Sequence, residues 1–341
     1  MTSVTRIDTV RLGGQDGPEV GVQGFGAMGI SEFYGATDEA AACATLDAAL
    51  EAGVTLIDTA DTYGLGANEE FLAPFLAAHR DEVVLATKFA IERRADDPAH
   101  RGIRNDPAYI RSAVENSLRR LGVETIDLYY MHRRDPQVPF AESVGAMAEL
   151  VREGKVRFLG LSEVTGPELR EAHAVHPIAA LQSEWSLFSR DVERSAVGAA
   201  ADLGVTVVPY SPLGRGFLTG AFADAAKDLQ GGDFRVHQPR FTGENAERNA
   251  ALLDPVRKIA AAHGATPAQI ALAWVQQRAA VHGLTVVPIP GTRKRSRLLE
   301  NAAATRITLT AAELAELEPI AGRVEGDRYP DMSFTALSRE V

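Results

Sequence analysis

Four side chains of this sequence could together move a proton. They are Asp58 and Tyr63 in LIDTADTYGLGANEE, Lys88 in VVLATKFA and His132 in IDLYYMH. Each lies at or just after the end of an apolar run of the kind that forms a buried strand, and the three runs follow one another along the chain. A carboxylate, a phenol, an ammonium group and an imidazole are groups that general acid–base catalysis uses. We therefore expect them to form a proton-transfer site.

The elements that must position these residues are predicted to be strands that alternate with helices. Eight short, β-branched segments are almost continuously apolar, as expected of parallel strands buried on both faces. Alanine- and leucine-rich segments with helical spacing separate them, so we predict an α/β fold, a (β/α)8 TIM barrel. An open doubly wound sheet is the alternative. The eight segments span residues 22–29, 54–60, 83–90, 126–132, 156–162, 178–184, 205–211 and 285–291.

The connections between these elements carry their own signals. Asp106 and Pro107 open one predicted helix and Gly122 closes it. Before the first strand, RIDTVRL and PEVGVQ flank the turn GGQDG, which predicts a hairpin that caps the bottom of the barrel. Residues 211–244 are too long for an ordinary connection and are interpreted as a loop over the mouth. The tail after Ala321 is interpreted as a further flap.

The composition describes a globular chain with no obvious target on nucleic acid or membranes. The 341 residues fit one barrel domain over residues 1–341. A net charge of −11 disfavours nucleic acid and anionic membranes as general partners. No apolar stretch approaches about 18 residues, and the start MTSVTRIDTV lacks the core of a secretion signal. The single cysteine, Cys43, is compatible with a reducing compartment, so a cytoplasmic location is expected.

Chemistry assigns each of the four residues a role. A lysine buried at a barrel mouth must be paired or hydrogen-bonded, and Asp58 is the obvious partner of Lys88. A tyrosine has a pKa of about 10, and a nearby cation lowers it, which Lys88 can do for Tyr63. Tyr63 would then protonate a developing alkoxide, and His132 would orient the carbonyl with a hydrogen bond. Taken singly, each residue could also be a loop cap, a rim side chain or a satisfied hydrogen-bonding group.

A second cluster follows the eighth strand, in PIPGTRKRSRLLEN. Arg293, Lys294, Arg295 and Arg297 stand at a helix start, where the helix dipole is already positive, so the cluster invites an anion. The glycine-rich PYSPLGRGFLTG follows the seventh strand, and these two loops are the usual phosphate site of the barrel. Two phosphate loops predict a dinucleotide, and the several cations favour NADP over NAD. A solvated face or a nucleic-acid patch is the alternative interpretation of the basic run.

No metal site is expected. His173 and His176 have the spacing of possible ligands, but no carboxylate or cysteine joins them. GFGAMG lacks the dinucleotide fingerprint, and its glycines are expected to allow a close backbone approach at the mouth.

Taken in order, these motifs resemble the aldo-keto reductase superfamily over nearly the whole chain. GVTLIDTADTYGLGANEE, ATKF, LYYMH, LQSEWSLFSR, PYSPLGRG and IPGTRKRSRLLEN follow the family's order. YYMHRRDP and PYSPLGRGFLTG are more similar to bacterial and plant members of the perakine-reductase and auxin-induced type. The resemblance implies a catalytic tetrad of Asp58, Tyr63, Lys88 and His132, and hydride transfer from a nicotinamide bound without a Rossmann domain.

The resemblance also implies the residues that hold NADP(H). Ser162 and Gln182 would bind the carboxamide, Tyr210 would stack on the nicotinamide, and Glu300 and Asn301 would contact adenine. Two departures from the family matter: Glu163 stands where many members have asparagine, and Gly291 stands where some have lysine. The remaining implied cofactor contacts are Gly26, Ala27, Met28, Asp58, Ser211, Pro212, Leu213, Gly214, Arg215, Gly216, Gly291, Thr292, Arg293, Lys294 and Arg297.

The expected function is the reversible, NADPH-dependent reduction of an aldehyde or ketone to an alcohol. An aromatic carbonyl, with an acidic group near Arg133, is one hypothesis for the substrate. A non-enzymatic NADPH-binding partner, like the channel β subunits of the superfamily, and a Schiff-base aldolase using Lys88 are the alternatives. Whether the chain is a monomer or a homo-oligomer is left open. The candidate pocket residues are Met28, Phe33, Tyr34, Phe89, Arg133 and Trp185.

Overall fold

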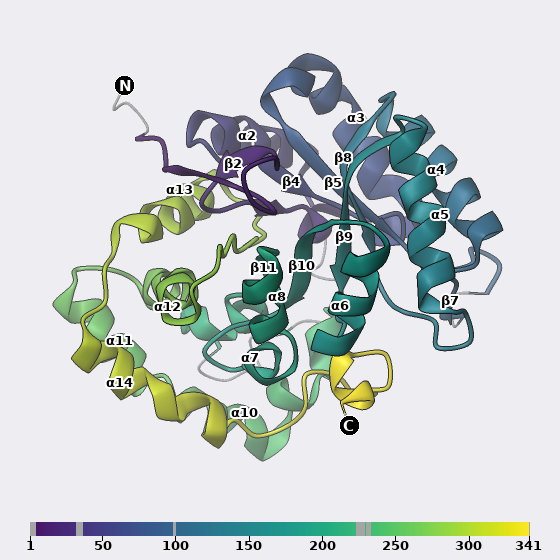
Figure 1. The fold of residues 1–341 in the computed structure, drawn as a ribbon. Helices are drawn as coiled ribbons and strands as arrows, with labels where there is room; N and C mark the ends of the chain where they lie inside the picture. The colour runs from purple at the N-terminus through teal and green to yellow at the C-terminus, as the bar shows by residue number, and fades with distance from the viewer. Residues whose placement is uncertain (1–4, 32–36, 98–99, 223–228, 230–232, 341) are drawn as a thin grey trace.

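A computed structural model shows a parallel β/α barrel, as predicted (Figure 1). It describes residues 5–31, 37–97, 100–222, 229 and 233–340. Seven strands pair in the order β11-β10-β9-β8-β5-β4-β3, and each neighbouring pair is parallel. They are β3 (Phe25–Gly26), β4 (Leu56–Asp58), β5 (Val84–Phe89), β8 (Ile126–Met131), β9 (Val156–Ser162), β10 (Ile178–Glu184) and β11 (Thr206–Tyr210).

The eighth predicted segment, residues 285–291, closes the barrel without forming a regular strand. Val287 donates its backbone N–H to Val207 of β11 at 3.0 Å, and Gly24 donates to Pro288 from the other side at 2.9 Å. Prolines at 288 and 290 have no N–H to give, which interrupts a regular ladder at this position. The first predicted segment is also shorter than expected, because the helix α1 (Met28–Ser31) begins two residues after β3.

The predicted hairpin is present and plugs the bottom of the barrel. Strands β1 (Thr9–Arg11) and β2 (Glu19–Gly21) pair antiparallel. Gly13 donates to the hydroxyl of Thr206, the first residue of β11, so the hairpin lies at the amino ends of the strands. Leu12 and Val20 pack into the cluster that fills the barrel interior. The opposite, carboxyl end is therefore left as the mouth.

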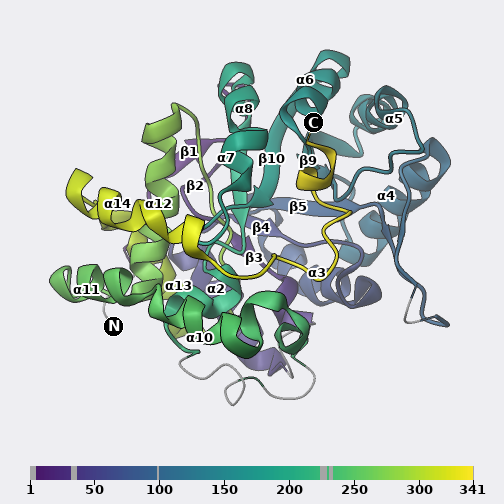
Figure 2. The same cartoon turned by 90° about the horizontal axis from the view of Figure 1, so that it is seen from below.

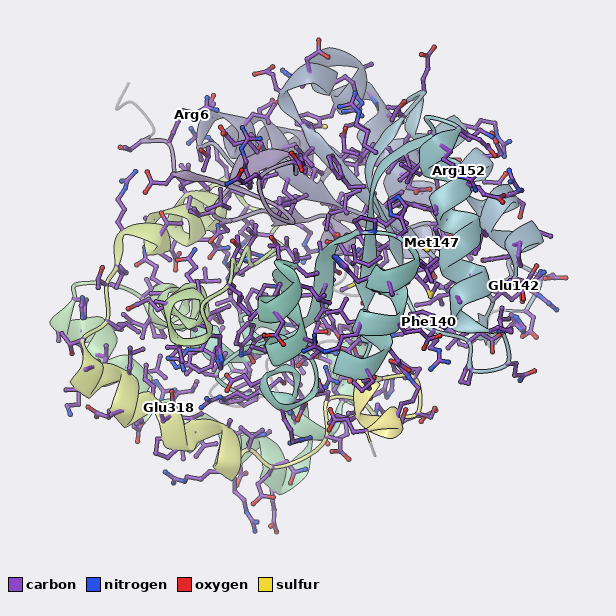
Figure 3. The ribbon with its side chains drawn as sticks, viewed as in Figure 1. Arg6, Phe140, Glu142, Met147, Arg152 and Glu318 are labelled. Carbon is purple, nitrogen blue, oxygen red and sulfur yellow. The ribbon has the colours of Figure 1, made fainter. Side chains whose placement is uncertain are left out.

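Helices surround the strands, and their burial follows their sequence. In α5, Phe140 and Met147 face the strands and are buried, whereas Glu142 and Arg152 point to solvent (Figure 3). Asp106 caps the first turn of α4 and Gly122 closes it with φ +66°, both as predicted. The helices that follow the strands are α2 (Glu39–Glu51), α3 (Ala67–His79), α4 (Pro107–Leu121), α5 (Phe140–Arg152), α6 (Gly166–Val175), α7 (Asp191–Ser195), α8 (Val197–Leu203), α12 (Pro267–His282) and α13 (Arg295–Ala303).

Two insertions modify the mouth. The long stretch after β11 contains the turns η3 (Gly214–Thr219), η4 (Phe234–His237) and η5 (Pro239–Phe241), and it leads into α10 (Gly243–Ala251) and α11 (Asp254–Ala262). After α14 (Ala311–Leu317) and η7 (Glu318–Arg323), the chain crosses the mouth and ends in η8 (Ala336–Arg339) beside α6 (Figure 2). We call residues 324–340 the C-terminal strap. It is the flap that the sequence predicted, and its position brings it onto the predicted site.

Smaller elements complete the described chain. They are the antiparallel pair β6 (Ile91–Glu92) and β7 (Gly102–Ile103), with the turns η1 (Tyr63–Gly66), η2 (Arg80–Glu82) and η6 (Ala304–Arg306). Within the described ranges, no helix is both long and apolar enough to cross a bilayer.

Candidate active site

The four predicted proton-transfer residues meet at the mouth. Asp58 is the last residue of β4, Lys88 is the penultimate residue of β5, and His132 directly follows β8. Tyr63 begins η1, the turn that follows β4. Because β4, β5 and β8 are parallel neighbours, their carboxyl ends lie at the same end of the barrel.

Lys88 is the centre of the site, and its hydrogen bonds are fully used. The side chain is completely buried, and its Nζ donates to Asp58 Oδ1 at 2.5 Å and to the carbonyl of Thr59 at 2.7 Å. A third, longer hydrogen bond of 3.4 Å reaches the phenolic oxygen of Tyr63. An ammonium group has three N–H donors and no acceptor. Each donor of Lys88 therefore has one acceptor, and Tyr63 must accept rather than donate in this pair.

Burial and pairing determine the charges. Burial lowers the pKa of Lys88, but Asp58 and Tyr63 raise it more strongly, so the net change is upward and the ammonium form persists. The pKa of Tyr63 is also raised, because its own burial outweighs the lowering by Lys88. This differs from the sequence-based expectation of a lowered pKa, which considered the cation but not the loss of solvent. Tyr63 consequently carries its proton at neutral pH.

The second carboxylate oxygen of Asp58 accepts a hydrogen bond from Gln182, which the family resemblance had assigned to the nicotinamide carboxamide. Gln182, in β10, donates its Nε2 to Asp58 Oδ2 at 2.8 Å. Both carboxylate oxygens therefore have a donor, and the position of Asp58 is fixed from two strands. The side-chain amide of Gln182 therefore faces the tetrad, whereas the resemblance implied a contact with the nicotinamide carboxamide.

His132 is buried and neutral. Burial lowers its pKa well below the ordinary value, and the charges of Arg133 and Lys88 lower it further. Its ring meets the ring of Tyr63 edge to face, with 6.0 Å between centroids. Its Nδ1 has no hydrogen-bond partner in the described part of the protein. A neutral imidazole beside the phenol can donate one hydrogen bond to a carbonyl oxygen.

Unusual backbone conformations gather at the mouth. Among described residues, five that are not glycine have positive φ angles, and each lies in a segment that follows a strand. Such conformations cost roughly 1–3 kcal/mol each and cluster at functional sites. Their concentration here supports the mouth as the site independently of the tetrad. The five residues are Leu65, Ala90, Glu163, Ser211 and Arg215.

The predicted phosphate loop after residue 291 lies against β3. A Cβ on Gly26 would come within 2.8 Å of the carbonyl of Ile289, and one on Gly291 within 2.6 Å of the carbonyl of Gly26. Glycine at both positions is what lets the two backbones touch. Lys294 and Arg297 are exposed at the start of α13, and neither makes an ion pair in the described chain. Exposed cations at a helix start suit an anionic phosphate.

The other residues assigned to NADP(H) near α13 differ in how far they are buried. Thr292 and Arg293 are partly buried in the same loop, and Asn301 is buried. Glu300 Oε1 accepts a hydrogen bond of 2.6 Å from Thr266. Its carboxylate is therefore held at the neighbouring helix start.

The second predicted phosphate loop, residues 211–216, is tightly turned. Gly214 donates to the carbonyl of Ser211 at 2.8 Å, and Gly214 and Gly216 have φ angles of +55° and +91°. The guanidinium of Arg215 pairs with Glu184 at 3.3 Å and stacks on the ring of Tyr329. The N–H groups of Gly214 and Gly216 are used within the turn, and the Arg215 side chain points back into the protein. Pro212 is buried, and Leu213 is partly buried.

Glu163, the departure from the family pattern, is occupied by the C-terminal strap. Its two carboxylate oxygens accept hydrogen bonds from Arg328 at 3.0 and 3.1 Å. The hydroxyl of Tyr210 donates to Oε1 at 2.9 Å. Arg328, the main lowering influence, brings the pKa of Glu163 down to about 2 against the effect of burial. This carboxylate therefore anchors the strap and is not available for a carboxamide.

The strap supplies residues that sequence reasoning missed. Tyr329 places its hydroxyl 3.2 Å from that of Tyr210, and its ring packs against Phe334. Phe334 in turn lies under the guanidinium of Arg133. The only sequence signal for these contacts was the predicted flap after Ala321, which gave no register. The mouth is consequently roofed on one side by aromatic rings.

The candidate pocket residues are not equivalent. Phe89 is fully buried and stacks on Tyr129 in the layer between strands and helices. Trp185 is also fully buried and donates its indole N–H to Glu193. We therefore place both in the core. Met28 is partly buried at the mouth, and Ala27 beside it is buried. Phe33 and Tyr34 lie outside the described residues.

Within the described ranges, no group of three or more histidine, cysteine, aspartate or glutamate side chains is arranged to hold a metal. His173 instead accepts a hydrogen bond from the backbone of Ile178.

Comparisons with known proteins agree with this geometry. The family model described as "Aldo/keto reductase family" matches residues 24–321. The glycerol dehydrogenase AKR11B4 from Gluconobacter oxydans is 31% identical, with a TM-score of 0.83 over 97% of this chain and 99% of that one. The aldo-keto reductase AKR11C1 from Bacillus halodurans, in its holo form, is 25% identical, with a TM-score of 0.74 over 96% of this chain and 100% of that one. The thermostable aldo-keto reductase Tm1743, solved with the inhibitor epalrestat, is 28% identical, with a TM-score of 0.70 over 92% and 100%.

Proposed function

The chain belongs to the aldo/keto reductase family, and we propose that it catalyses the NADPH-dependent, reversible reduction of an aldehyde or ketone, with Tyr63 as the general acid. Within the family we place it nearest the perakine-reductase and auxin-induced type, on the residues YYMHRRDP and PYSPLGRGFLTG. We further propose a cytoplasmic enzyme that acts on small carbonyl compounds.

The hydrogen bonding of Lys88 carries the proposal. Because Lys88 can only donate, the phenolic oxygen of Tyr63 accepts from it, and the Tyr63 proton must point elsewhere. The raised pKa of Tyr63 keeps that proton in place until an alkoxide develops nearby. Lys88 then stabilises the phenolate that forms, through the hydrogen bond that already exists. This is the behaviour required of a general acid.

The other residues orient the reaction. His132, being neutral, can donate a hydrogen bond to the carbonyl oxygen and hold it beside Tyr63. Asp58 and Gln182 fix Lys88 and stabilise its charge. NADPH, when bound, supplies the hydride. Its 2′-phosphate would lie at Lys294 and Arg297, its pyrophosphate at the backbone of residues 211–216, and its nicotinamide against Tyr210, with Ser162 beside the carboxamide.

Replacement of Tyr63 by phenylalanine tests the proposal. The change removes only the phenolic hydroxyl, so kcat with 4-nitrobenzaldehyde should fall by about 10²- to 10⁴-fold, the usual contribution of a general acid. Steady-state oxidation of NADPH measures the rate, and a fluorescence titration checks that NADPH still binds. A Tyr63→Phe enzyme that works at the wild-type rate refutes this mechanism. Titration with NADH in parallel tests the preference for the phosphorylated cofactor.

The charge state of Lys88 argues against the aldolase alternative. A Schiff base requires a neutral amine, whereas Lys88 is held as an ammonium by Asp58 and has no free donor. Borohydride in the presence of a carbonyl substrate should therefore leave the mass of the protein unchanged.

The binding-partner alternative predicts a different kinetic result. A non-enzymatic partner would retain NADPH tightly and show negligible turnover over a panel of aldehydes and ketones, whereas the proposed reductase turns over repeatedly.

A further inference from the structure

We propose that Arg133 binds a carboxylate of the substrate, so that the enzyme prefers aldehydes or ketones that carry an acidic group. This inference rests on the proposed reductase function and names the substrate class for the same site.

Arg133 is a buried cation that makes no ion pair with a carboxylate among the described residues. Three arginines count as buried among the described residues when the exposure of the whole residue is compared. Arg278 pairs with Glu318 at 2.8 Å, and Arg328 pairs with Glu163 at 3.0 Å. Arg133, which is 5% exposed, makes no ion pair within the described chain. Burying an unpaired charge is costly, so a cation left in this condition favours an anionic ligand.

The hydrogen bonds of Arg133 leave part of its guanidinium without a partner. One terminal nitrogen, NH1, donates to the carbonyl of His132 at 2.7 Å and to the hydroxyl of Ser162 at 3.1 Å. The buried Nε has no partner in the described structure. The His132 carbonyl and the Ser162 hydroxyl are both uncharged, so they orient the guanidinium without neutralising its charge. A guanidinium held in this way suits the planar, two-oxygen geometry of a carboxylate.

Its position is beside the reacting groups. Arg133 directly follows His132, and its charge lowers the pKa of both His132 and Tyr63. A carbonyl oriented by His132 and Tyr63 would therefore place a second substituent close to Arg133. The anion bound there would belong to a compact substrate, in which the carboxylate and the carbonyl are parts of one small molecule.

The surroundings exclude internal candidates for the anion. The charge of Glu163 raises the pKa of Arg133, but both oxygens of Glu163 accept hydrogen bonds from Arg328. The hydroxyls of Tyr210 and Tyr329 lie in the same cluster, but burial raises the pKa of Tyr210, which keeps it neutral. Phe334 covers the guanidinium at 5.4 Å from its ring centroid. An aromatic ring bearing the carboxylate could pack against this roof.

A matched pair of substrates tests the inference. We would compare 3- and 4-carboxybenzaldehyde with their methyl esters, which keep the ring and the aldehyde but lose the charge. A charge-assisted hydrogen bond to Arg133 should make kcat/KM about 10- to 100-fold higher for the acids than for the esters. In Arg133→Met the ratio should fall to about one, and Arg133→Lys should restore part of it because the charge remains.

Arg134→Met is the matched control. It removes the same charge one residue away, from a guanidinium that is already paired with Glu168, so the ratio of acid to ester should stay as in the wild type. If Arg133→Met does not fold, inhibition of the wild type by benzoate and benzamide replaces it. Benzoate should then compete with a neutral aldehyde at least about 10-fold better than benzamide.

The outcomes separate the two proposals. Turnover of acids and esters with equal kcat/KM overturns the role of Arg133 but leaves the reductase intact. A ratio that survives Arg133→Met, with NADPH affinity lowered instead, would assign Arg133 to the nicotinamide carboxamide and refute the inference. No turnover of either class by the wild type would refute the reductase function on which the inference rests.

Discussion

Asp58→Asn should destabilise the protein strongly, although it changes one oxygen to one NH₂ group. In the wild type, Lys88 is completely buried, and among the described residues Asp58 is its only carboxylate partner, at 2.5 Å. The amide retains the shape of the side chain but removes its charge, so the ammonium of Lys88 would remain buried and uncompensated. Removing one partner of a buried ion pair costs about 3–5 kcal/mol.

The expected shift in melting temperature follows from the length of the chain. The unfolding entropy of 341 residues is about 0.7 kcal/mol per kelvin, so a loss of 3–5 kcal/mol lowers Tm by about 4–7 °C. Without Asp58, burial lowers the pKa of Lys88 below its unfolded value. The folded state then binds fewer protons than the unfolded state, so stability rises with pH. The deficit of the variant should therefore shrink between about pH 7 and pH 9.

Calorimetry of four variants separates this effect from a general loss of packing. Asp58→Asn/Lys88→Met removes both charges and should recover much of the lost stability. Together with Asp58→Asn and Lys88→Met measured singly, it should give a coupling free energy above about 1 kcal/mol. Glu316→Gln makes the same chemical change in the exposed pair with Lys258, and its Tm should move by no more than about 1 °C. If Asp58→Asn melts within 1 °C of the wild type at pH 7, our account of Lys88 is wrong.

Two further predictions concern the mouth and the barrel wall. Glu163 has a folded pKa of about 2 and an ordinary value of 4.5, so its ion pair stabilises the folded state fully above about pH 5, and the contribution of roughly 3 kcal/mol is lost as pH falls toward 2. The Tm difference between the wild type and Glu163→Gln should accordingly be large at pH 6 and smaller at pH 3; a constant difference would contradict this. Gly160→Ala would put a Cβ 2.4 Å from the buried ring of Tyr130 and should cost about 1–3 kcal/mol by urea unfolding. Gly198→Ala, in an open position of α8, should cost nothing, and equal behaviour of the two variants would refute the packing argument.

The sequence predicted those features that depend on local pattern. Apolar segments and helix ends defined the barrel, because strand burial and capping are written within a few residues, as at Asp106 and Gly122. The partnership of Lys88 with Asp58 was also predictable, because both lie at the ends of neighbouring strands and a buried lysine needs an acid. Position in the barrel order was sufficient for these inferences.

The features that were missed join residues far apart in the chain. Gln182 reaches Asp58 across 124 residues, and Arg328 reaches Glu163 across 165. Neither contact has a spacing that a single sequence displays, so Gln182 and Glu163 could only be assigned by resemblance. The sign of the pKa shift of Tyr63 was wrong for a related reason: the charge of Lys88 was visible in the sequence, whereas the extent of burial was not.

Three buried cations at the mouth have different roles, and each role follows from whether the cation is paired with a carboxylate. Lys88 is neutralised by Asp58 and so can hold Tyr63 without binding an anion itself. Arg328 is neutralised by Glu163 and so fixes the strap over the mouth. Glutamate at position 163 therefore commits this position to the strap. Arg133 makes an ion pair with neither carboxylate, so it is the cation that remains for a ligand. If our proposal holds, its charge gives the otherwise neutral roof of Tyr329 and Phe334 a preference for acidic substrates.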